Sequence, residues 1–535
     1  MISLPPLARV VLLNLMLIGV VVVTAIDLKA ICKTTLYPDS CFNRLAPIVD
    51  SQVDNVGHHE LYRLSIGVAI TEVLGVANGF LKLEEEFKNV SDVMSLSALK
   101  YCRKMLDTRA VTSLKDCLVT PNNGKPTTER IEDLKTWLTA AGVYHQTCID
   151  AFEEAKDEVL RHAVLEQLKS SIELTSNSLT ILYTFEESLA SKPRLGMGSS
   201  GMSRWISKAE RKILETPLKD IHIDIVVAKD GSGNFKTIGD ALKVVPTDGT
   251  RFVMYVKAGT YYEILKVDST KSNLIMIGDG MDATIISGNL CKDRGIGSYD
   301  TPTIAISGAG FIAKNMGFKN TAGPKMGQAV ALRVESDKAV FYQCKIAGYQ
   351  DTLLAQANRQ FFYQCKIYGT IDFIFGYSAA VFKNTQILIR NPAPNMVTVI
   401  TAQGKYEPAA NSGFSFISCT ISAAEDIGNC PTFLGRPWKD YSTTVFSYSD
   451  MGNLIDPKGW CAFGDKKPDT IYYGEYKNSG PGSPTGQRVR WKGVHSRMRF
   501  AEANKFSVDA FIDGGDWIPG TGVPSSIHSR KLLID

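Results

Sequence analysis

Two aspartates in the second half of the chain, Asp351 and Asp372, stand in the same phase of a repeated sequence. The hexapeptide FYQCKI occupies residues 341–346 and returns at 362–367, a shift of 21 residues that also carries Asp351 onto Asp372. A pattern that returns at a fixed period indicates one structural unit per repeat, each stacked on the next. We therefore expect the two carboxyl groups to lie close together on neighbouring units.

Carboxyl groups this close do not ionise together, so the pair offers both a proton donor and an ionised oxygen at neutral pH. Taken singly, either aspartate reads as an ordinary turn residue, whereas their shared phase favours a catalytic pair. Two reactions fit such a pair. A retaining glycosidase uses carboxyls ~5 to 5.5 Å apart, and an acyl-transfer enzyme uses one carboxylate as nucleophile and the other as acid.

Two glutamines favour acyl transfer over glycoside hydrolysis. Gln328 precedes Gln350 by 22 residues, so both side chains are expected beside the acids. Their amide groups can donate hydrogen bonds to the oxyanion of a tetrahedral intermediate, which a glycosidase does not need. The residues therefore point to hydrolysis of an ester.

Arg436 is a candidate to bind one of the carboxylates, and Trp438 is a candidate to contact a sugar ring. A guanidinium can hold a carboxylate through two parallel hydrogen bonds, and an indole offers a flat apolar face to a sugar ring. The alternative for Arg436 is an ordinary surface ion pair. The sequence has no GxSxG motif, no sign of a Ser-His-Asp triad and no CxxC pair or histidine-rich cluster that suggests zinc.

The elements that must position these side chains are short strands. After Ile221 the chain consists of β-rich runs separated by Gly and Asn, which recur about every 20 residues. This pattern predicts a parallel β-helix, in which residues of the same phase stack ~4.8 Å apart. Stacking would bring Cys344 and Cys365 inside the Cα window of ~4.4 to 6.8 Å that a disulfide needs, so we predict a disulfide there.

The first half of the chain, residues 26–188, is expected to be helical, and an antiparallel helical bundle is the natural architecture. One apolar helix face is defined by Leu165, Leu168, Ile172, Leu179 and Leu182. Residues 189–214 are rich in Gly, Ser and basic residues and read as a linker. It ends near Arg211 and Lys212, a dibasic pair that we predict to be a processing site. Residues 215–535 form the predicted catalytic domain.

The N-terminus indicates export. Residues 1–25 contain one Arg, an apolar run from Val10 to Val23 and small residues up to Ala25, which is the pattern of a signal peptide cleaved after Ala25. An uncleaved anchor is the alternative, because the run is only slightly shorter than a spanning helix. In an oxidising compartment the 11 cysteines become candidates for disulfides, and the sequon at Asn89 becomes a candidate glycosylation site. The net charge of +4 is too mild to define a partner, and no nucleic acid is expected.

At this point the residues resemble a known family. GTYYE (259–263), QAVAL (328–332), GYQDTL (348–353), GTIDFIFG (369–376) and LGRPW (434–438) are similar, in order and spacing, to the signatures of pectin methylesterases. IYYGEYKNSGPG (471–482) matches as well, and the resemblance spans about residues 224–517. The first half resembles the inhibitor-like pro-domain of plant members through ICKTTLYPDSC (31–41) and the segments that end at Cys102 and Cys148.

The resemblance implies a right-handed parallel β-helix that hydrolyses the methyl esters of pectin in the plant cell wall. Asp372 would be the nucleophile, Asp351 the acid and then the base, and Gln328 and Gln350 the oxyanion donors. Arg436 would orient Asp372, and no metal or organic cofactor would be required. The residues implied to contact substrate are Gln328, Arg436, Trp438, Trp460 and Phe373.

The resemblance further implies a four-helix bundle with the bridges Cys32–Cys41 and Cys102–Cys148, leaving Cys117 without an obvious partner. The bundle would restrain the enzyme until a subtilase-type protease cleaves at the basic motif, and separate inhibitor proteins could bind as well.

The chain departs from the family pattern at four positions, none of them a catalytic side chain. Tyr377 replaces an Asn after DFIFG, Gly327 a His or basic residue, Thr443 an Arg, and Phe463 the second Trp of GWxxW. Two alternatives stay open: a catalytically impaired pectin-binding or inhibitor protein, and a polygalacturonase or lyase on the same fold. The latter would need a further Asp cluster with a His, or a calcium site, and the sequence offers neither.

Overall fold

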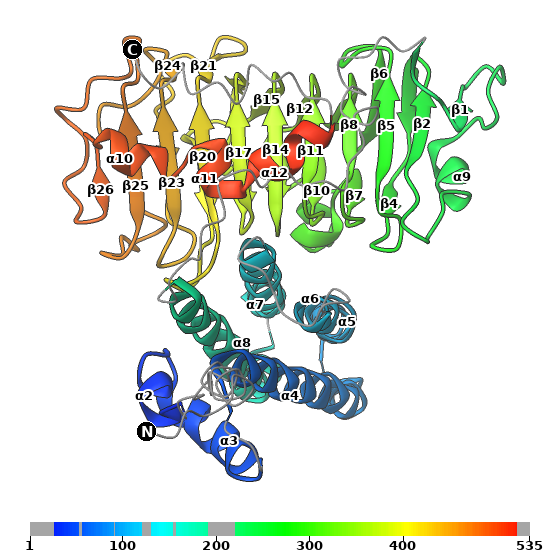
Figure 1. Cartoon of the computed structure of the whole chain (residues 1–535). Coiled ribbons are helices and arrows are strands. Elements are labelled where there is room, and N and C mark those ends of the chain that lie inside the picture. Colours follow the sequence, from blue (N-terminus) through cyan, green and yellow to red (C-terminus); the bar gives the residue numbers. More distant parts are fainter. Residues whose placement is uncertain are drawn as a thin grey trace, which may run out of the picture.

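The computed structural model describes residues 26–52, 56–89, 91–119, 130–153, 157–190 and 220–521. The predicted signal segment 1–25 lies outside these residues, and so do Arg211, Lys212 and nearly all of the predicted linker. The described chain has two parts, a helical bundle and a long β-structure beside it (Figure 1).

The N-terminal half is helical, as the sequence predicts. A short hairpin, α2 (Leu28–Lys33) and α3 (Pro38–Asp50), precedes four long helical stretches. These stretches are α4 (His58–Phe87), α5 to α6 (Val93–Lys104 and Val111–Leu118, joined by a π-helical turn over Met105–Ala110), α7 (Ile131–Glu153) and α8 (Glu158–Ala190). The Asp92 side chain caps α5 by accepting hydrogen bonds from the backbone N–H groups of Met94 and Ser95.

Two disulfides hold the bundle together, Cys32–Cys41 and Cys102–Cys148. Cys117 is a buried free thiol. Helix α4 is long and apolar enough to cross a membrane by length and composition. Its residues Leu61, Ile66 and Phe80 are fully buried in the bundle core.

The C-terminal half is a right-handed parallel β-helix, also as predicted. Each complete coil contributes one strand to each of three sheets, and every pairing between named strands is parallel. The first sheet, here sheet A, contains β1 (Ile225–Val227), β2 (Phe252–Val256), β5 (Leu274–Gly278), β8 (Ile312–Lys314), β11 (Ala339–Tyr342), β14 (Arg359–Tyr363), β17 (Ala379–Lys383), β20 (Gly413–Ile417), β23 (Thr443–Ser447), β25 (Tyr472–Tyr476) and β26 (Val494–His495).

The other two sheets complete the coils. Sheet B contains β3 (Gly259–Tyr262), β6 (Thr284–Gly288), β9 (Gly317–Asn320), β12 (Lys345–Ala347), β15 (Lys366–Gly369), β18 (Gln386–Ile389), β21 (Thr420–Ala423) and β24 (Asp450–Met451). Sheet C contains β4 (Leu265–Val267), β7 (Ile304–Ile306), β10 (Leu332–Val334), β13 (Leu353–Ala355), β16 (Ile374–Gly376), β19 (Thr398–Gln403) and β22 (Thr432–Gly435).

The repeat explains how the core is filled. Strands β11 and β14 pair with Phe341 opposite Phe362, which is the 21-residue shift of the sequence. The two rings stack 4.9 Å apart, and the stack continues through Phe382, Phe416 and Phe446 at 4.4–4.8 Å. Phenylalanines at the same position of successive coils therefore form a continuous stack of rings inside the β-helix.

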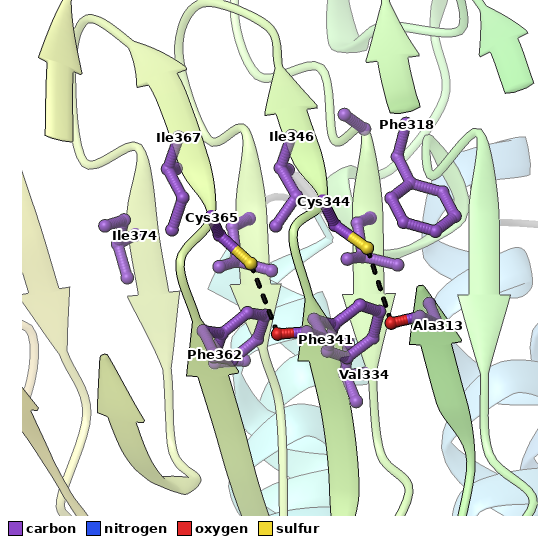
Figure 2. Packing of buried hydrophobic residues seen from close by; sticks show 14 of the residues in the cluster. Ala313, Phe318, Val334, Phe341, Cys344, Ile346, Phe362, Cys365, Ile367 and Ile374 are labelled. Atoms are coloured by element: carbon purple, nitrogen blue, oxygen red, sulfur yellow. Dashed lines mark hydrogen bonds between the residues drawn. The ribbon is translucent and has the colours of Figure 1, made fainter. Parts of the chain in front are cut away.

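The predicted Cys344–Cys365 disulfide is wrong. Both residues are buried free thiols, and Figure 2 shows their side chains pointing in the same direction. The Cys344 thiol lies 3.5 Å from the Ala313 carbonyl oxygen, and the Cys365 thiol 3.3 Å from that of Phe341. In-register stacking gives the expected spacing but also makes the two Cβ directions parallel, whereas a disulfide needs them to converge.

Short helices close the first coil of the β-helix and cover part of sheet A. Helix α9 (Ile238–Lys243) closes the first coil, and α10 (Phe500–Asn504), α11 (Val508–Ile512) and α12 (Gly514–Trp517) run across the outer face of sheet A (Figure 1). Val508, Ile512 and Trp517 bury an apolar patch of that sheet. The helical bundle lies against another side, with α7 close to the strands (Figure 1).

Candidate active site

Asp351 and Asp372 occupy equivalent corners of neighbouring coils, between sheet B and sheet C. The strands that follow them, β13 and β16, pair with Leu353 opposite Ile374, and the Asp351 backbone N–H donates to the Ile371 carbonyl at 3.0 Å. Both aspartates have left-handed backbone, with φ of +62° and +51°. Both side chains line the same cavity, which has a volume of about 690 Å³. The geometry thus places both acids at one corner facing one space.

Arg436 clamps Asp372 from the end of β22. Its Nε donates to one carboxylate oxygen at 2.8 Å and its Nη2 to the other at 2.5 Å. The Arg436 backbone N–H is fixed by the Thr401 carbonyl at 2.9 Å, so strand pairing sets where the guanidinium lies. Burial raises the pKa of Asp372, and the two hydrogen bonds and the charge of Arg436 oppose that shift.

Gln328 and Gln350 lie on the same cavity. Backbone hydrogen bonds fix both residues, because the Gln328 carbonyl accepts from the Lys292 N–H at 2.9 Å and the Gln350 carbonyl from the Ala329 N–H at 3.2 Å. Their side-chain amides have no hydrogen-bond partner among the described residues and remain available to a ligand. The structure therefore gathers all five predicted catalytic residues around one cavity.

Not all of the predicted substrate contacts line this cavity. Trp438 lines the cavity, but Phe373 and Trp460 lie inside the β-helix core with 0% and 1% exposure. Trp460 stacks on Tyr473 at 4.2 Å, and Phe373 packs against Gly369. Neither ring can reach a substrate in this position.

Two other aromatic residues line the cavity instead. Phe375 points outward from β16, in register with Leu354, and Phe463 lies over the Arg436 guanidinium at 4.5 Å from ring centroid to carbon. Strand alternation could have indicated Phe375, because adjacent residues of a strand point to opposite faces. Phe463 stands at the position where the family pattern has its second Trp, so an aromatic ring is retained there.

Gly376 follows Phe375 and permits the tight turn after β16. Its φ is +124°, and a Cβ there would lie 2.2 Å from the Ala355 carbonyl oxygen. Tyr377, which replaces the usual Asn, is buried beneath Trp438 with the two rings 4.8 Å apart. Its hydroxyl donates a hydrogen bond to Asp150 of α7. Tyr377 therefore links the Trp438 ring to helix α7 of the bundle.

The bundle closes the cavity from the opposite side. Residues from α5 and α7, among them Met94, Tyr101, Thr147 and Asp150, line it together with the β-helix residues. Lys439, next to Trp438, pairs with Asp150 at 2.6 Å. The cleft is thus covered in the intact chain.

Further contacts hold the bundle against the β-helix beyond the cavity. Arg359 is fully buried and pairs with Asp133 of α7 at 2.5 Å and with Asp337 at 2.6 Å. Glu407 accepts a hydrogen bond from Ser176 of α8 at 2.5 Å. Thr139 accepts from the Asn411 N–H at 2.9 Å. These contacts span several coils, so the covering is extensive.

The predicted glycosylation site lies at the surface of the bundle. Asn89, the residue predicted to be glycosylated, is exposed just after α4. Within the described residues no group of three or more His, Cys, Asp or Glu side chains is arranged to hold a metal ion.

A parallel β-helix with a clamped carboxylate in a cleft lined by aromatic rings defines a class, the polysaccharide-active hydrolases. Comparison with known proteins narrows the class. Residues 224–516 match the family described as Pectinesterase, and residues 27–181 match the plant invertase/pectin methylesterase inhibitor family.

The similarity extends along nearly the whole chain. A putative pectinesterase/pectinesterase inhibitor 24 of Arabidopsis thaliana is 41% identical over 94% of this chain and 87% of its own length. Pectinesterase 3 of Phaseolus vulgaris is 40% identical over 93% and 86%. The solved pectin methylesterase from carrot is 42% identical with a TM-score of 0.56, and covers 57% of this chain and 97% of its own. The chain belongs to the pectinesterase family and carries an inhibitor-like domain in the same polypeptide.

Proposed function

We propose that this chain hydrolyses the methyl esters of pectin, releasing methanol and leaving a carboxylate on the sugar. The observation that carries the proposal is the bidentate Arg436–Asp372 pair, which lies on the same cavity as Asp351 and two unpartnered glutamine amides. This set contains a nucleophile, an acid and oxyanion donors, which together are what ester hydrolysis needs.

In the first half of the reaction Asp372 attacks the carbonyl carbon of the methyl ester. The negative charge that forms on the carbonyl oxygen accepts hydrogen bonds from Gln328 and Gln350. Asp351 gives its proton to the departing methoxide, so methanol leaves and an acyl-enzyme anhydride remains. Arg436 keeps Asp372 oriented and favours its ionised form against the effect of burial.

In the second half Asp351, now ionised, takes a proton from water. The resulting hydroxide attacks the acyl carbon, again through an oxyanion beside Gln328 and Gln350. The bond between that carbon and the Asp372 oxygen breaks, which restores the Asp372 carboxylate and frees the product as a carboxylic acid. The acid then loses its proton to solvent and becomes a carboxylate. Asp351 ends protonated, as it began, so the cycle is balanced.

The glycosidase alternative differs in its products. An esterase releases methanol without new reducing ends, whereas a polygalacturonase creates reducing ends without methanol. Both products should therefore be measured on methylated pectin after the chain has been cleaved between residues 190 and 220. Methanol alone supports the proposal, reducing ends alone support the glycosidase, and neither product supports the impaired binding protein.

The inhibitor-like domain is proposed to restrain the enzyme in cis. Its helices α5 and α7 cover the cavity that contains both aspartates, so a polymer cannot reach them while the bundle is docked. We also propose that the chain is secreted to the cell wall, that a subtilase-type protease cleaves it at Arg211–Lys212, and that separate inhibitor proteins use the same surface once the bundle has left. An Arg211→Gln, Lys212→Gln variant should then stay uncleaved and inactive in plant cells, while the unsubstituted chain matures.

A further inference from the structure

The three outer faces of the β-helix differ in what covers them. Helices α11 and α12 bury part of sheet A, and the helical bundle closes the cavity on the outer face of sheet C, which Leu354 and Phe375 line. On sheet B, by contrast, Lys319 is exposed and Lys366 and Tyr368 are half-buried. Within the part of the chain that the structure describes, no helix covers these side chains of sheet B.

Outward side chains of sheet B form a basic cluster that spans three coils. Lys345 of β12 pairs in register with Lys366 of β15, so the two lie on adjacent coils ~4.8 Å apart. Lys319 lies one coil earlier and is in register with Ala347. Lys319, Lys345, Tyr368 and Arg390 line a groove of about 240 Å³, which we call the sheet B groove. Lys366 lies beside the groove, in register with Lys345.

The charge of the groove is only partly neutralised. Lys345 pairs with Asp282 at 2.9 Å and lies 5.0 Å from the centre of the Tyr368 ring. Arg390 approaches Glu425 at 3.6 Å. Lys319 and Lys366 have no ion-pair partner within 4.0 Å among the described residues. Three cationic side chains of the groove, with Lys366 beside them, therefore face two carboxylates, Asp282 and Glu425, which leaves an excess of positive charge.

The groove adjoins the catalytic corner. The Arg390 Nη1 donates to the Gly348 carbonyl at 3.2 Å, and its Nη2 donates to the Tyr349 hydroxyl at 2.6 Å. Gly348 and Tyr349 directly precede Gln350 and Asp351 in the chain. A polymer that lies on the sheet B groove is thus one corner away from the acids.

We propose that the sheet B groove binds de-esterified pectin, a polymer with one carboxylate on each sugar. The inference rests on the proposed function, because this polyanion is the product of the proposed reaction. Its carboxylates would meet the ammonium groups of Lys319, Lys345 and Lys366 along the coil axis, and a sugar ring would lie on Tyr368. Methylated pectin lacks these charges, so the groove discriminates product from substrate and retains the enzyme beside a region already processed.

The intact chain is suited to the test, because the bundle covers the cleft and leaves the groove open. Binding of polygalacturonate and of fully methyl-esterified pectin should be measured by calorimetry at low and high salt. The unsubstituted chain is expected to bind polygalacturonate at least about tenfold more tightly than the methylated polymer, and high salt should remove most of that preference.

Variants locate the binding. Lys319→Gln, Lys345→Gln, Lys366→Gln together should weaken polygalacturonate binding about tenfold. The matched control, Lys236→Gln, Lys492→Gln, Lys505→Gln, removes the same charge from exposed positions elsewhere on the β-helix and should change it little. Equal losses in the two triple variants, or equal affinity for the two polymers, would overturn the proposal. Methanol release by the cleaved unsubstituted chain is read separately, so failure of the proposed function is recognised independently of the binding result.

Discussion

At the scale of single residues, the site depends on how Arg436 holds Asp372. Two hydrogen bonds from one rigid guanidinium fix both carboxylate oxygens, and the pair is packed beneath Phe463. A lysine at this position would keep a positive charge but could not bind both oxygens in the same fork. Orientation and charge can therefore be separated by substitution.

We expect Arg436→Lys to lower kcat for methanol release roughly 10²-fold, because Asp372, the proposed nucleophile, loses its fixed orientation. Arg436 opposes the rise in the pKa of Asp372 that burial causes. Weakening this contact raises the pKa further, so the acid limb of the kcat/KM profile should move to higher pH. An unchanged profile would show that Arg436 does not act on Asp372.

Trp438 and Trp460 offer a matched pair, since one lines the cavity and the other lies in the core. Trp438→Ala should raise KM for pectin with a small change in melting temperature. Trp460→Ala should instead destabilise the β-helix by about 3–5 kcal/mol, as large-to-small changes in a packed core do. Thermal unfolding and steady-state kinetics of both variants distinguish the two roles, and a rise in KM at normal stability for Trp460→Ala would contradict the placement.

For single residues, the sequence predicted which side chains could carry out the chemistry better than it predicted which way each side chain points. The acids, the glutamines and Arg436 could be found because their phase and spacing carry the signal. Phe373 and Trp460 were misplaced because residue type does not say whether a ring points inward or outward. That depends on strand alternation and on the turn before each strand, which motifs do not encode.

At the scale of elements, the coil is the unit that fixes every spacing. The stack from Phe341 to Phe446 and the corner that carries the aspartates follow from one register. The period could be predicted from the doubled hexapeptide, and the parallel sheets with it. The state of the stacked thiols could not, because it depends on side-chain direction within the coil.

The two core thiols give a direct test of this account. In the denatured, unreduced protein, an alkylating reagent should modify Cys344 and Cys365, while the residues of the two bundle disulfides stay protected. Without denaturant the same two thiols should react slowly because they are buried. Peptide mass mapping reports both results, and a linked peptide containing Cys344 and Cys365 would contradict the structure.

At the scale of the whole molecule, the bundle and the β-helix meet across several buried polar contacts. Sequence reasoning predicted that the domains interact but named no contact, because pairs such as Arg359 with Asp133 join residues more than 200 positions apart. Such contacts depend on how the surfaces of the two folded domains fit together. Two of the acids at this interface also make the fit depend on pH.

Glu335 lies fully buried between the domains, 3.6 Å from Arg109 of the bundle and 3.4 Å from Arg333. Burial raises its pKa from 4.5 to about 7, against the charge of Arg109. Burial likewise raises the pKa of Asp150 to about 6, against its contact with Lys439. Both groups hold their protons more tightly when docked than they would in water.

A raised pKa in the docked state means that docking is strongest at low pH. The contribution of Glu335 is fully present below about pH 4.5 and is lost as the pH rises through about 7. After cleavage between the domains, the helical fragment should co-elute with the β-helix in acid and separate from it near neutrality. Glu335→Gln should flatten this dependence. Docking that strengthens as the pH rises would contradict the interface described above.

The most direct test of the central claim is the rate of methanol release by the cleaved Asp372→Asn variant, which keeps the size and packing of the side chain but removes the nucleophilic carboxylate. The account predicts a loss of roughly 10⁴-fold or more in kcat with an unchanged melting temperature. A variant that retains a tenth or more of the activity would show that the two stacked acids do not carry the reaction.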